Sequence, residues 1–586
     1  MSRRALILAV TTASLGVTAV PALAAENCVG KRAGCHATLQ AALDAAEDGD
    51  TITLEPGTFA GGVTVTKSVA LAGAGQGATT VKGGGPVLTI GTLFDDSPPT
   101  VSIRDMTITG GRTTSSPQSV EFVGEEGVIA LGGGIEIPPG HDFTPGADVT
   151  IARTTITDNR VAPTGTVALG PPCPGDERCP FAQAAGGGID SWGTLTITDS
   201  TISGNRVGSA SGISTLASDA EAGGIHSLIG SLTILRSRID NNRATASAPN
   251  GRYADAGGVF AFDAPFTMRD SSISSNTANL AAGLPSSVEQ EAHAGGLHLA
   301  DSVPSATIAR SAITNNSVGM TNTAGDAVVF SGGLHVDLFV DFQISDSVIS
   351  GNRVNAETLG SSPGVAHGDG GGGQLFGRME RTRVFGNTVT AIAAAGDAEA
   401  MAGGSWVLFG EVSDSELRGN HLRATARDGL ATVRGGGAVV DTAPELPDQG
   451  GLSLSNSSVA SNIAIATGST TLAHGGGIFD AVLPGGPFGG PLVLSATNVV
   501  HNVLGGGAGA TLQGGGVYLA GASLTQSGGN VAHNVPDQCF GCGGSLVSQA
   551  AHARVHSTLR GRAYATRRPL PSPGFALSGT SPGTGP

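Results

Sequence analysis

The stretch GGGIDSWGTLTITDSTISGN, residues 186–205, decides the fold. A glycine pair opens it, apolar residues alternate with polar ones at Leu195, Ile197 and Ile202, and Asn205 closes it. Apolar residues at every second position are typical of a strand with one buried face. The same order of elements recurs about eleven times in the 586 residues. A unit repeated in this way predicts a solenoid whose turns stack on their neighbours.

The closing asparagines mark the period of the repeat, about 37 residues. They are Asn159, Asn205, Asn242, Asn276, Asn316, Asn352, Asn387, Asn420, Asn462, Asn502 and Asn534. The spacing varies only between each asparagine and the next glycine pair, which predicts a loop of variable length at one fixed corner. Asparagine tolerates the left-handed backbone region, and stacked amides can bond along an axis. We therefore predict that these residues occupy corners and form a structural ladder.

The opening ATLQAALDAAEDGDTITLEPGTF, residues 37–59, resembles the N-terminus of right-handed parallel β-helix proteins of the pectin-lyase-like superfamily. The later GGGI or GGL and ISGN, ITNN or VHNV elements resemble repeats of the polymorphic outer-membrane-protein type. The resemblance covers roughly residues 36–545 and implies an all-β fold, a single right-handed parallel β-helix. Lyases, hydrolases, epimerases and non-enzymatic surface proteins share that superfamily, so the resemblance leaves the function open.

The first part of the chain is predicted to form a cap that covers one end of the strand stack. Leu39, Ala42, Leu43 and Ala46 share one face of a predicted short helix between residues 36 and 48. Such a cap covers the unpaired backbone groups at the end of a stack. With about 4.8 Å of rise per turn, thirteen or fourteen turns predict a rod about 65 Å long.

The N-terminus is typical of a signal peptide. Arg3 and Arg4 precede an apolar run, residues 5–20, and Ala22-Leu23-Ala24 forms a cleavage site, which we place after Ala24. No later stretch has the apolar length of a membrane-spanning helix. We therefore expect a secreted protein, extracellular or cell-wall-associated. The predicted organisation is signal peptide (1–24), N-terminal cap (25–60), β-helix repeats (61–545) and a disordered basic tail (546–586).

The six cysteines fall into three close pairs, and export makes disulfides the expected state. The pairs are Cys28 with Cys35, Cys173 with Cys179, and Cys539 with Cys542. The last pair, in Cys-Phe-Gly-Cys, leaves half of a zinc site or a redox pair open as alternatives.

Composition excludes some partners. Glycine accounts for 93 residues, aromatic residues for 4%, and the net charge is −16. A composition rich in glycine and poor in aromatic residues fits many tight corners around a thin aliphatic core. An acidic surface argues against nucleic acid and anionic membranes as main partners.

One row of side chains is the candidate site. In each GG-x-X element the residue x should point inward, so X should point to solvent. The X residues are Glu136, Asp190, His226, Phe260, His298, His335, Leu375, Trp406, Val439, Phe479 and Tyr518. Acids and imidazoles dominate the first half of this row, and aromatic residues the second.

Two kinds of chemistry follow from that row. Glu136 and Asp190 on neighbouring turns should lie roughly 5 Å apart, the separation of a retaining glycosidase, with His226 as base or proton relay. Aromatic rings on a wet surface are platforms for sugar faces, so Phe260, His298, His335, Trp406, Phe479 and Tyr518 are candidate ligand-binding residues. His335 and Asp337 repeat the imidazole–acid theme.

The function predicted from the sequence is an adhesin-like rod that presents an elongated surface, with polysaccharide or another cell-surface component as its partner. The alternatives are a polysaccharide lyase or glycoside hydrolase acting along the row, and a structural spacer. The chain lacks the Asn-Thr-Asp, Gly-His-Gly and Arg-Ile-Lys elements of polygalacturonase-like members, which favours a protein that is not an enzyme. No cofactor is expected, although loop acids such as Asp369 leave a calcium site open.

Overall fold

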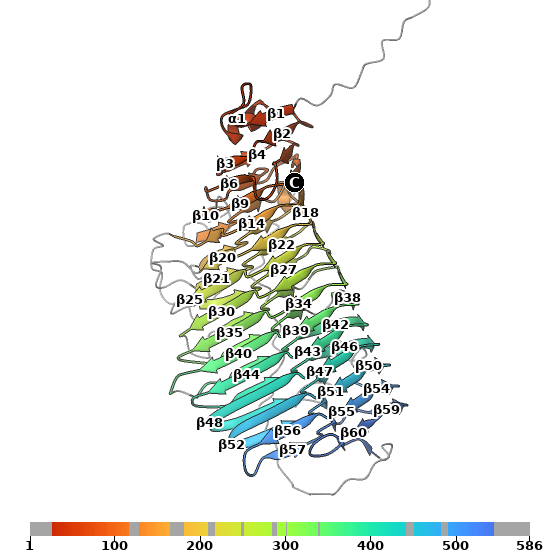
Figure 1. The fold of residues 1–586 in the computed structure, drawn as a ribbon. Coiled ribbons are helices and arrows are strands. Elements are labelled where there is room, and N and C mark those ends of the chain that lie inside the picture. Colours follow the sequence, from red (N-terminus) through yellow and green to blue (C-terminus); the bar gives the residue numbers. More distant parts are fainter. Residues whose placement is uncertain are drawn as a thin grey trace, which may run out of the picture.

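The computed structural model is a parallel β-helix, a stack of short strands with one helix at its first end (Figure 1). It describes residues 26–116, 128–164, 181–208, 217–247, 251–283, 290–300, 302–337, 340–361, 363–440, 451–481 and 490–543. Neighbouring turns pair in parallel, as in β17–β22 and β18–β23, and this continues down the stack. The predicted fold class is confirmed.

One turn illustrates the whole stack. After the glycine pair come β17 (Ile189–Ser191), β18 (Thr194–Thr198) and β19 (Thr201–Ser203), which surround the main core. β20 (Arg206–Gly208) then leaves this core, and β21 (Ala217–Glu221) returns to the next glycine pair. The apolar residues of the alternating run, including Leu195, Ile197 and Ile202, are fully buried in the main core, as the pattern predicts.

The turns can be counted from the third strand of each turn. These strands form a 14-stranded sheet in the described part of the chain, in agreement with the predicted thirteen or fourteen turns. They are β3 (Gly57–Ala60), β6 (Thr79–Lys82), β9 (Thr107–Thr109), β14 (Thr155–Thr157), β19, β24 (Arg238–Asp240), β29 (Ser272–Ser274), β34 (Ala312–Thr314), β39 (Val348–Ser350), β43 (Arg383–Phe385), β47 (Glu416–Arg418), β51 (Ser458–Ala460), β55 (Asn498–Val500) and β60 (Val531–Ala532).

The segment between each asparagine and the next glycine pair is a second lobe, not the loop that we predicted. Strands such as β25 (Arg243–Ser247) and β26 (Gly251–Asp255) run out and back, and together they form a 20-stranded sheet. Their alanines, among them Ala244, Ala246 and Ala254, pack into a second core. Alanine alternates with polar residues there, and this period-two pattern suits strands that pack closely face to face.

The second lobe widens down the stack (Figure 1). Its strands lengthen to β48 (His421–Arg434) and β52 (Ile463–His474). Variable length is also not confined to this lobe. Residues 138–147 separate β12 (Ile135–Ile137) from β13 (Asp148–Ala152), whereas only residues 192 and 193 separate β17 from β18. The prediction of a single variable corner was therefore wrong.

The corner asparagines form the predicted ladder. Nδ2 of Asn276 donates to Oδ1 of Asn316 at 3.0 Å and to the backbone oxygen of Ile239 at 3.0 Å. The same bonds link every member from Asn159 to Asn534, and Nδ2 of Asn534 donates to Gln538 at 3.2 Å.

The left-handed backbone lies one residue earlier than predicted. The residues with positive φ are those before the asparagines, such as Asp158, Asn241 and Asn315, each between 54° and 58°. The asparagine therefore stabilises the corner through the hydrogen bonds of its side chain, and the residue before it adopts the left-handed backbone conformation of the turn. The second glycine of each pair packs on this amide: a Cβ on Gly224 would lie 3.0 Å from Nδ2 of Asn242 and 2.5 Å from the backbone oxygen of Gly258.

The first end of the stack carries α1 (Leu39–Ala45). Thr38 caps it by accepting a hydrogen bond from the backbone N–H of Ala41, and the predicted apolar face is buried. Beside it lies β1 (Glu26–Val29), which pairs with β2 (Thr51–Leu54).

Two of the three predicted cysteine pairs are joined. Disulfides link Cys28 to Cys35 and Cys539 to Cys542. The third predicted pair, Cys173 and Cys179, lies outside the described residues, so a disulfide between Cys173 and Cys179 stays a prediction.

The signal peptide and the basic tail also lie outside the described residues. No helix among the described residues is long and apolar enough to cross a membrane.

Candidate functional site

The predicted row of side chains exists and is in register, with one correction: Gln374, not Leu375, is the partner of Trp406, because this turn has a third glycine, Gly373, that pairs with Leu334. Glu136 pairs with Asp190, Asp190 with His226, His226 with Phe260, Phe260 with His298, and His298 with His335. Farther down, Trp406, Val439, Phe479 and Tyr518 continue it in register. The strands that carry these residues are β12, β17, β22 (Ile225–Leu228), β27 (Val259–Phe262), β32 (Leu297–Leu299), β37 (Leu334–Val336), β46 (Ser405–Ser413), β49 (Ala438–Val440), β53 (Ile478–Ala481) and β58 (Val517–Ala520).

The predicted exposure of this row was wrong. Glu136, Asp190, His226 and His298 are all less than 5% exposed, and Trp406 reaches only 8%, the largest value among the predicted members whose side chains the structure describes. The polar members lie in the corner where the returning strand of the second lobe meets the next turn. The lower members Trp406, Val439, Phe479 and Tyr518 pack with the main core. His226 lies against Glu221 of β21, and His298 against Asp255 of β26. Because the second lobe had been interpreted as loops, its contacts with the row were not foreseen.

The first polar cluster in this corner joins Asp190, His226 and Glu221. Nδ1 of His226 lies 2.6 Å from Oδ1 of Asp190, and Nε2 lies 3.2 Å from Oε2 of Glu221. Burial raises the pKa of the Asp190 carboxyl, and its bond to His226 only partly opposes this. Burial lowers the pKa of His226, but the two carboxylates outweigh it and raise that pKa to about 9. The predicted catalytic trio thus includes one tightly bonded acid–imidazole pair.

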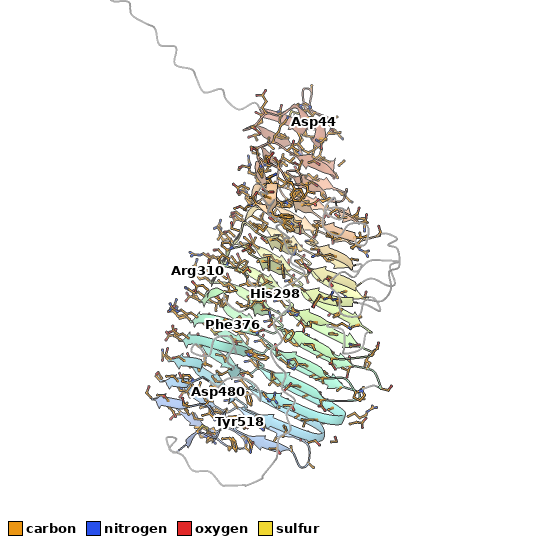
Figure 2. All side chains as sticks on the ribbon, turned by 180° about the vertical axis from the view of Figure 1, so that it is seen from behind. Asp44, His298, Arg310, Phe376, Asp480 and Tyr518 are labelled. Atoms are coloured by element: carbon orange, nitrogen blue, oxygen red, sulfur yellow. A yellow bond between two sulfur atoms is a disulfide. The ribbon has the colours of Figure 1, made fainter. Side chains whose placement is uncertain are left out.

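The second cluster, hereafter the imidazole cluster, consists of His293, His298 and His335. One nitrogen from each ring lies within 4.8 Å of those of the other two. His298 and His335 belong to the predicted row, whereas His293 ends β31 (Glu291–His293) of the second lobe. Figure 2 shows His298 within the width of the stack, midway along it, whereas Arg310 lies at an edge.

Acidic and hydroxyl groups hold each ring of this cluster. Asp255 contacts Nδ1 of His298 through both carboxylate oxygens at 2.8 Å. Glu291 lies 3.0 Å from Nε2 of His293, and Oγ of Ser331 lies 2.9 Å from Nδ1 of His335.

Asp337 completes the cluster from the same strand end as His335. Its Oδ1 lies 2.8 Å from Nε2 of His335 and 3.4 Å from Nε2 of His298. Burial alone would raise the pKa of Asp337, but the neighbouring imidazoles hold it well below its usual range. Burial lowers the pKa of His298, and Asp255 and Asp337 reverse this and raise it to about 10.

A third cluster follows one turn later. His367 lies 3.4 Å from Asp369 and 3.3 Å from Glu399, and Glu399 also pairs with Arg434. Asp369 ends β41 (Ala366–Asp369) and is fully buried, so it does not lie in the loop that we predicted. Burial raises the pKa of Asp369.

The far end of the row is aromatic. Phe479, Tyr518 and Phe540 stack with ring centroids 5.2 and 5.1 Å apart and planes 8° from parallel. His474 stacks on Tyr518 at 4.4 Å. These rings pack against one another and are buried or, in Phe540, half-exposed, so they present no continuous platform for a sugar face.

A different row of charges lies exposed, at the corner between the second and third strand of each turn. It alternates sign from turn to turn, and we call it the Asp/Arg ladder: Asp105, Arg153, Asp199, Arg236, Asp270, Arg310, Asp346, Arg381 and Asp414. Each arginine bonds the aspartate of the preceding turn through two nitrogens, as Arg310 does with Asp270 at 2.7 and 2.8 Å.

Sequence reasoning missed the Asp/Arg ladder and His293, although both leave signals. Each ladder residue stands three positions before the central apolar residue of the third strand, as in Asp199-Ser-Thr-Ile202 and Arg236-Ser-Arg-Ile239. His293 and His298 flank one glycine pair in His-Ala-Gly-Gly-Leu-His. A glycine pair at a sharp corner brings its two flanks together, so that spacing predicts neighbouring imidazoles.

Comparison with known proteins identifies no family for this chain. No family model matches the chain, and no curated protein matches it. Among solved structures, the A-module of a mannuronan C-5 epimerase from Azotobacter vinelandii is similar, with 14% identity and a TM-score of 0.27 over 83% of this chain and 94% of that one.

Proposed function

We propose that this protein is exported and binds an elongated polysaccharide along the outer face of its 14-stranded sheet. One observation carries the proposal: hydroxyl side chains recur in register on that face. Thr155 pairs with Thr201 and Thr157 with Ser203. The next turn carries Arg238 and Asp240 at these positions, and Ser272 and Ser274 restore the hydroxyl groups one turn later. Hydroxyl groups donate and accept hydrogen bonds, and side chains in register on turns about 4.8 Å apart suit a polymer that lies along the axis.

The Asp/Arg ladder borders this face and supports the same proposal. Its ion pairs are exposed and neutralise one another, so the face next to it carries little net charge along the ladder. Charges on the face itself are also paired, as in Arg238 with Asp240 and Arg418 with Glu416. A surface of hydroxyl groups and paired charges favours a hydroxylated polymer over a purely ionic one. The binding role predicted for the buried row moves, in this proposal, to the exposed face.

The test is polymer binding by paired variants. Binding to a panel of uronic-acid and neutral polysaccharides is measured by calorimetry for the unaltered protein and for Thr157→Lys/Ser203→Lys. We expect the double variant to lose at least tenfold in affinity. The matched control is Thr245→Lys/Asn279→Lys, an in-register pair on the second lobe, which should bind normally. Equal binding by both double variants would contradict the proposal.

We propose polysaccharide cleavage at the Asp190–His226 pair as a second candidate function. The observation that favours it is the short contact of 2.6 Å between Oδ1 of Asp190 and Nδ1 of His226, together with a raised pKa of both groups, because perturbed ionisable pairs cluster at functional sites. The same panel is screened for unsaturated products by ultraviolet absorbance and for new reducing ends. Turnover abolished by Asp190→Ala and by Glu136→Ala would support an enzyme, and absence of turnover on every polymer would leave binding as the function.

A further inference from the structure

We propose that the imidazole cluster binds a divalent transition metal, with zinc as the best match, through His293, His298, His335 and Asp337. Three imidazole nitrogens and one carboxylate oxygen form a donor set that zinc prefers. This inference stands apart from the proposed binding of polysaccharide and needs no part of it.

In each histidine of the imidazole cluster, one ring nitrogen contacts a neighbouring acid or hydroxyl group, and the other is available to a metal. Asp255 and Ser331 occupy Nδ1 of His298 and His335, and Glu291 occupies Nε2 of His293. The remaining atoms are Nδ1 of His293, Nε2 of His298 and Nε2 of His335. The first two are buried and make no hydrogen bond, although Nε2 of His298 lies 3.4 Å from Asp337. Unpaired buried nitrogens cost free energy unless a ligand satisfies them.

The spacing of the donors is close to that of a zinc site. Bond lengths of 2.0–2.1 Å in a tetrahedron place ligand atoms about 3.3 Å apart. Oδ1 of Asp337 lies 3.4 Å from Nε2 of His298 and 2.8 Å from Nε2 of His335. One nitrogen of each of the three rings lies within 4.8 Å of the others, so binding would require the rings to move closer by about 1.5 Å at most.

The hydrogen bonds around the three histidines match those found around histidine ligands in metal sites. Each histidine ligand in such sites gives its second N–H to a carboxylate, a carbonyl or another acceptor, which fixes the ring and its tautomer. Asp255, Glu291 and Ser331 take these positions on His298, His293 and His335.

Charge balance supports a cation at this place. Asp255, Glu291 and Asp337 bring three carboxylates to one corner, and Asp255 and Asp337 are buried. Buried carboxylates need compensating positive charge. With four protein ligands the site is closed, which is typical of a structural rather than a catalytic metal.

The test uses the full chain, purified without a polyhistidine tag and stripped with a chelator. Zinc binding is measured by calorimetry and melting temperature, and Co²⁺ is added as a spectroscopic probe. We expect one zinc per chain, a melting temperature raised by several degrees, and the intense visible bands of tetrahedral cobalt. Octahedral cobalt bands or no stoichiometric zinc would overturn the proposal, whatever the variants do.

Variants locate the site. His298→Gln/His335→Gln should abolish stoichiometric zinc binding, and Asp255→Asn should weaken it 10–100-fold while keeping the four ligands. His226→Gln is the control within the same buried row, and His533→Gln removes one of two stacked surface imidazoles, His501 and His533, that could capture metal adventitiously. Unchanged affinity in Asp255→Asn, or loss of zinc in His533→Gln alone, would place the metal elsewhere.

Discussion

At the residue scale, each corner asparagine uses its whole amide inside the stack. Oδ1 of Asn276 accepts from both the backbone N–H and Nδ2 of Asn242, at 3.0 Å each. Its Nδ2 donates onward to Asn316 and to a strand carbonyl. An aspartate side chain lacks the N–H donors, and a leucine side chain lacks both the donors and the acceptor. No other residue of this size can therefore make all the hydrogen bonds of the corner.

This dependence predicts a large cost for Asn276→Leu. The change leaves two buried donors of Asn242 without an acceptor, and we expect about 3 kcal/mol less free energy of unfolding, measured by denaturant titration. Asn279→Leu, on the outward face of β30 (Thr277–Ala282), serves as control and should change stability by less than about 0.5 kcal/mol. Similar effects of the two changes would show that the ladder contributes little.

His474 predicts a dependence of stability on pH. Burial, with Arg434 nearby, lowers its pKa from 6.5 to about 4, and it stacks on Tyr518. A folded-state pKa below the unfolded value means that stability is fully present above pH 6.5 and is lost as the pH falls toward 4. His474→Phe keeps the stacking and removes the proton site.

The measurement is the free energy of unfolding of both proteins between pH 7 and 4. A shift of this size corresponds to about 3 kcal/mol between the two limits. We expect the unaltered protein to lose up to that amount more than His474→Phe over this interval. Parallel curves for the two proteins would contradict the buried neutral state of His474.

At the element scale, the glycine pair and the asparagine form one unit, because the second glycine packs on the amide of the same corner. Gly224→Ala places a Cβ 2.5 Å from the backbone oxygen of Gly258, a separation that forces the two turns apart. We expect a loss of several kcal/mol, of the order of an overpacked core. Gly208→Ala is the control, since its Cβ would meet no atom within 4 Å. The melting temperatures of the two variants are compared, and an equal change in both would contradict the prediction.

Strand pattern explains what could be predicted and what could not. Period-two alternation and the repeat predicted the register that brings Asp190 beside His226. Helical spacing of apolar residues predicted the buried face of α1. The burial of the row that contains Asp190 and His226 could not be predicted, because the strands of the second lobe cover it. These alanine-rich strands resemble polar loops in composition. The imidazole cluster needed His293, which comes from that lobe, so the pattern of the main turn alone revealed only two of its three rings.

At the scale of the whole molecule, α1 closes one end of the main core. Ala42 is buried against the stack, whereas Ala41 is exposed. Ala42→Asp should detach the helix, uncover the edge of the first turn and cause self-association, because an open strand edge pairs with other chains. Ala41→Asp is the control. Light scattering coupled to size-exclusion chromatography measures the result, and a monomeric Ala42→Asp variant would contradict the capping role.

The longitudinal bonds of the stack also have a mechanical consequence. Ladder amides and strand hydrogen bonds all run along the axis, and each turn contacts only its neighbours. A pull applied between the two ends therefore loads the turns in series, so the weakest interface between turns sets the breaking force. Under tension such a rod yields one turn at a time and releases chain gradually, which makes it an extensible tether rather than a brittle strut.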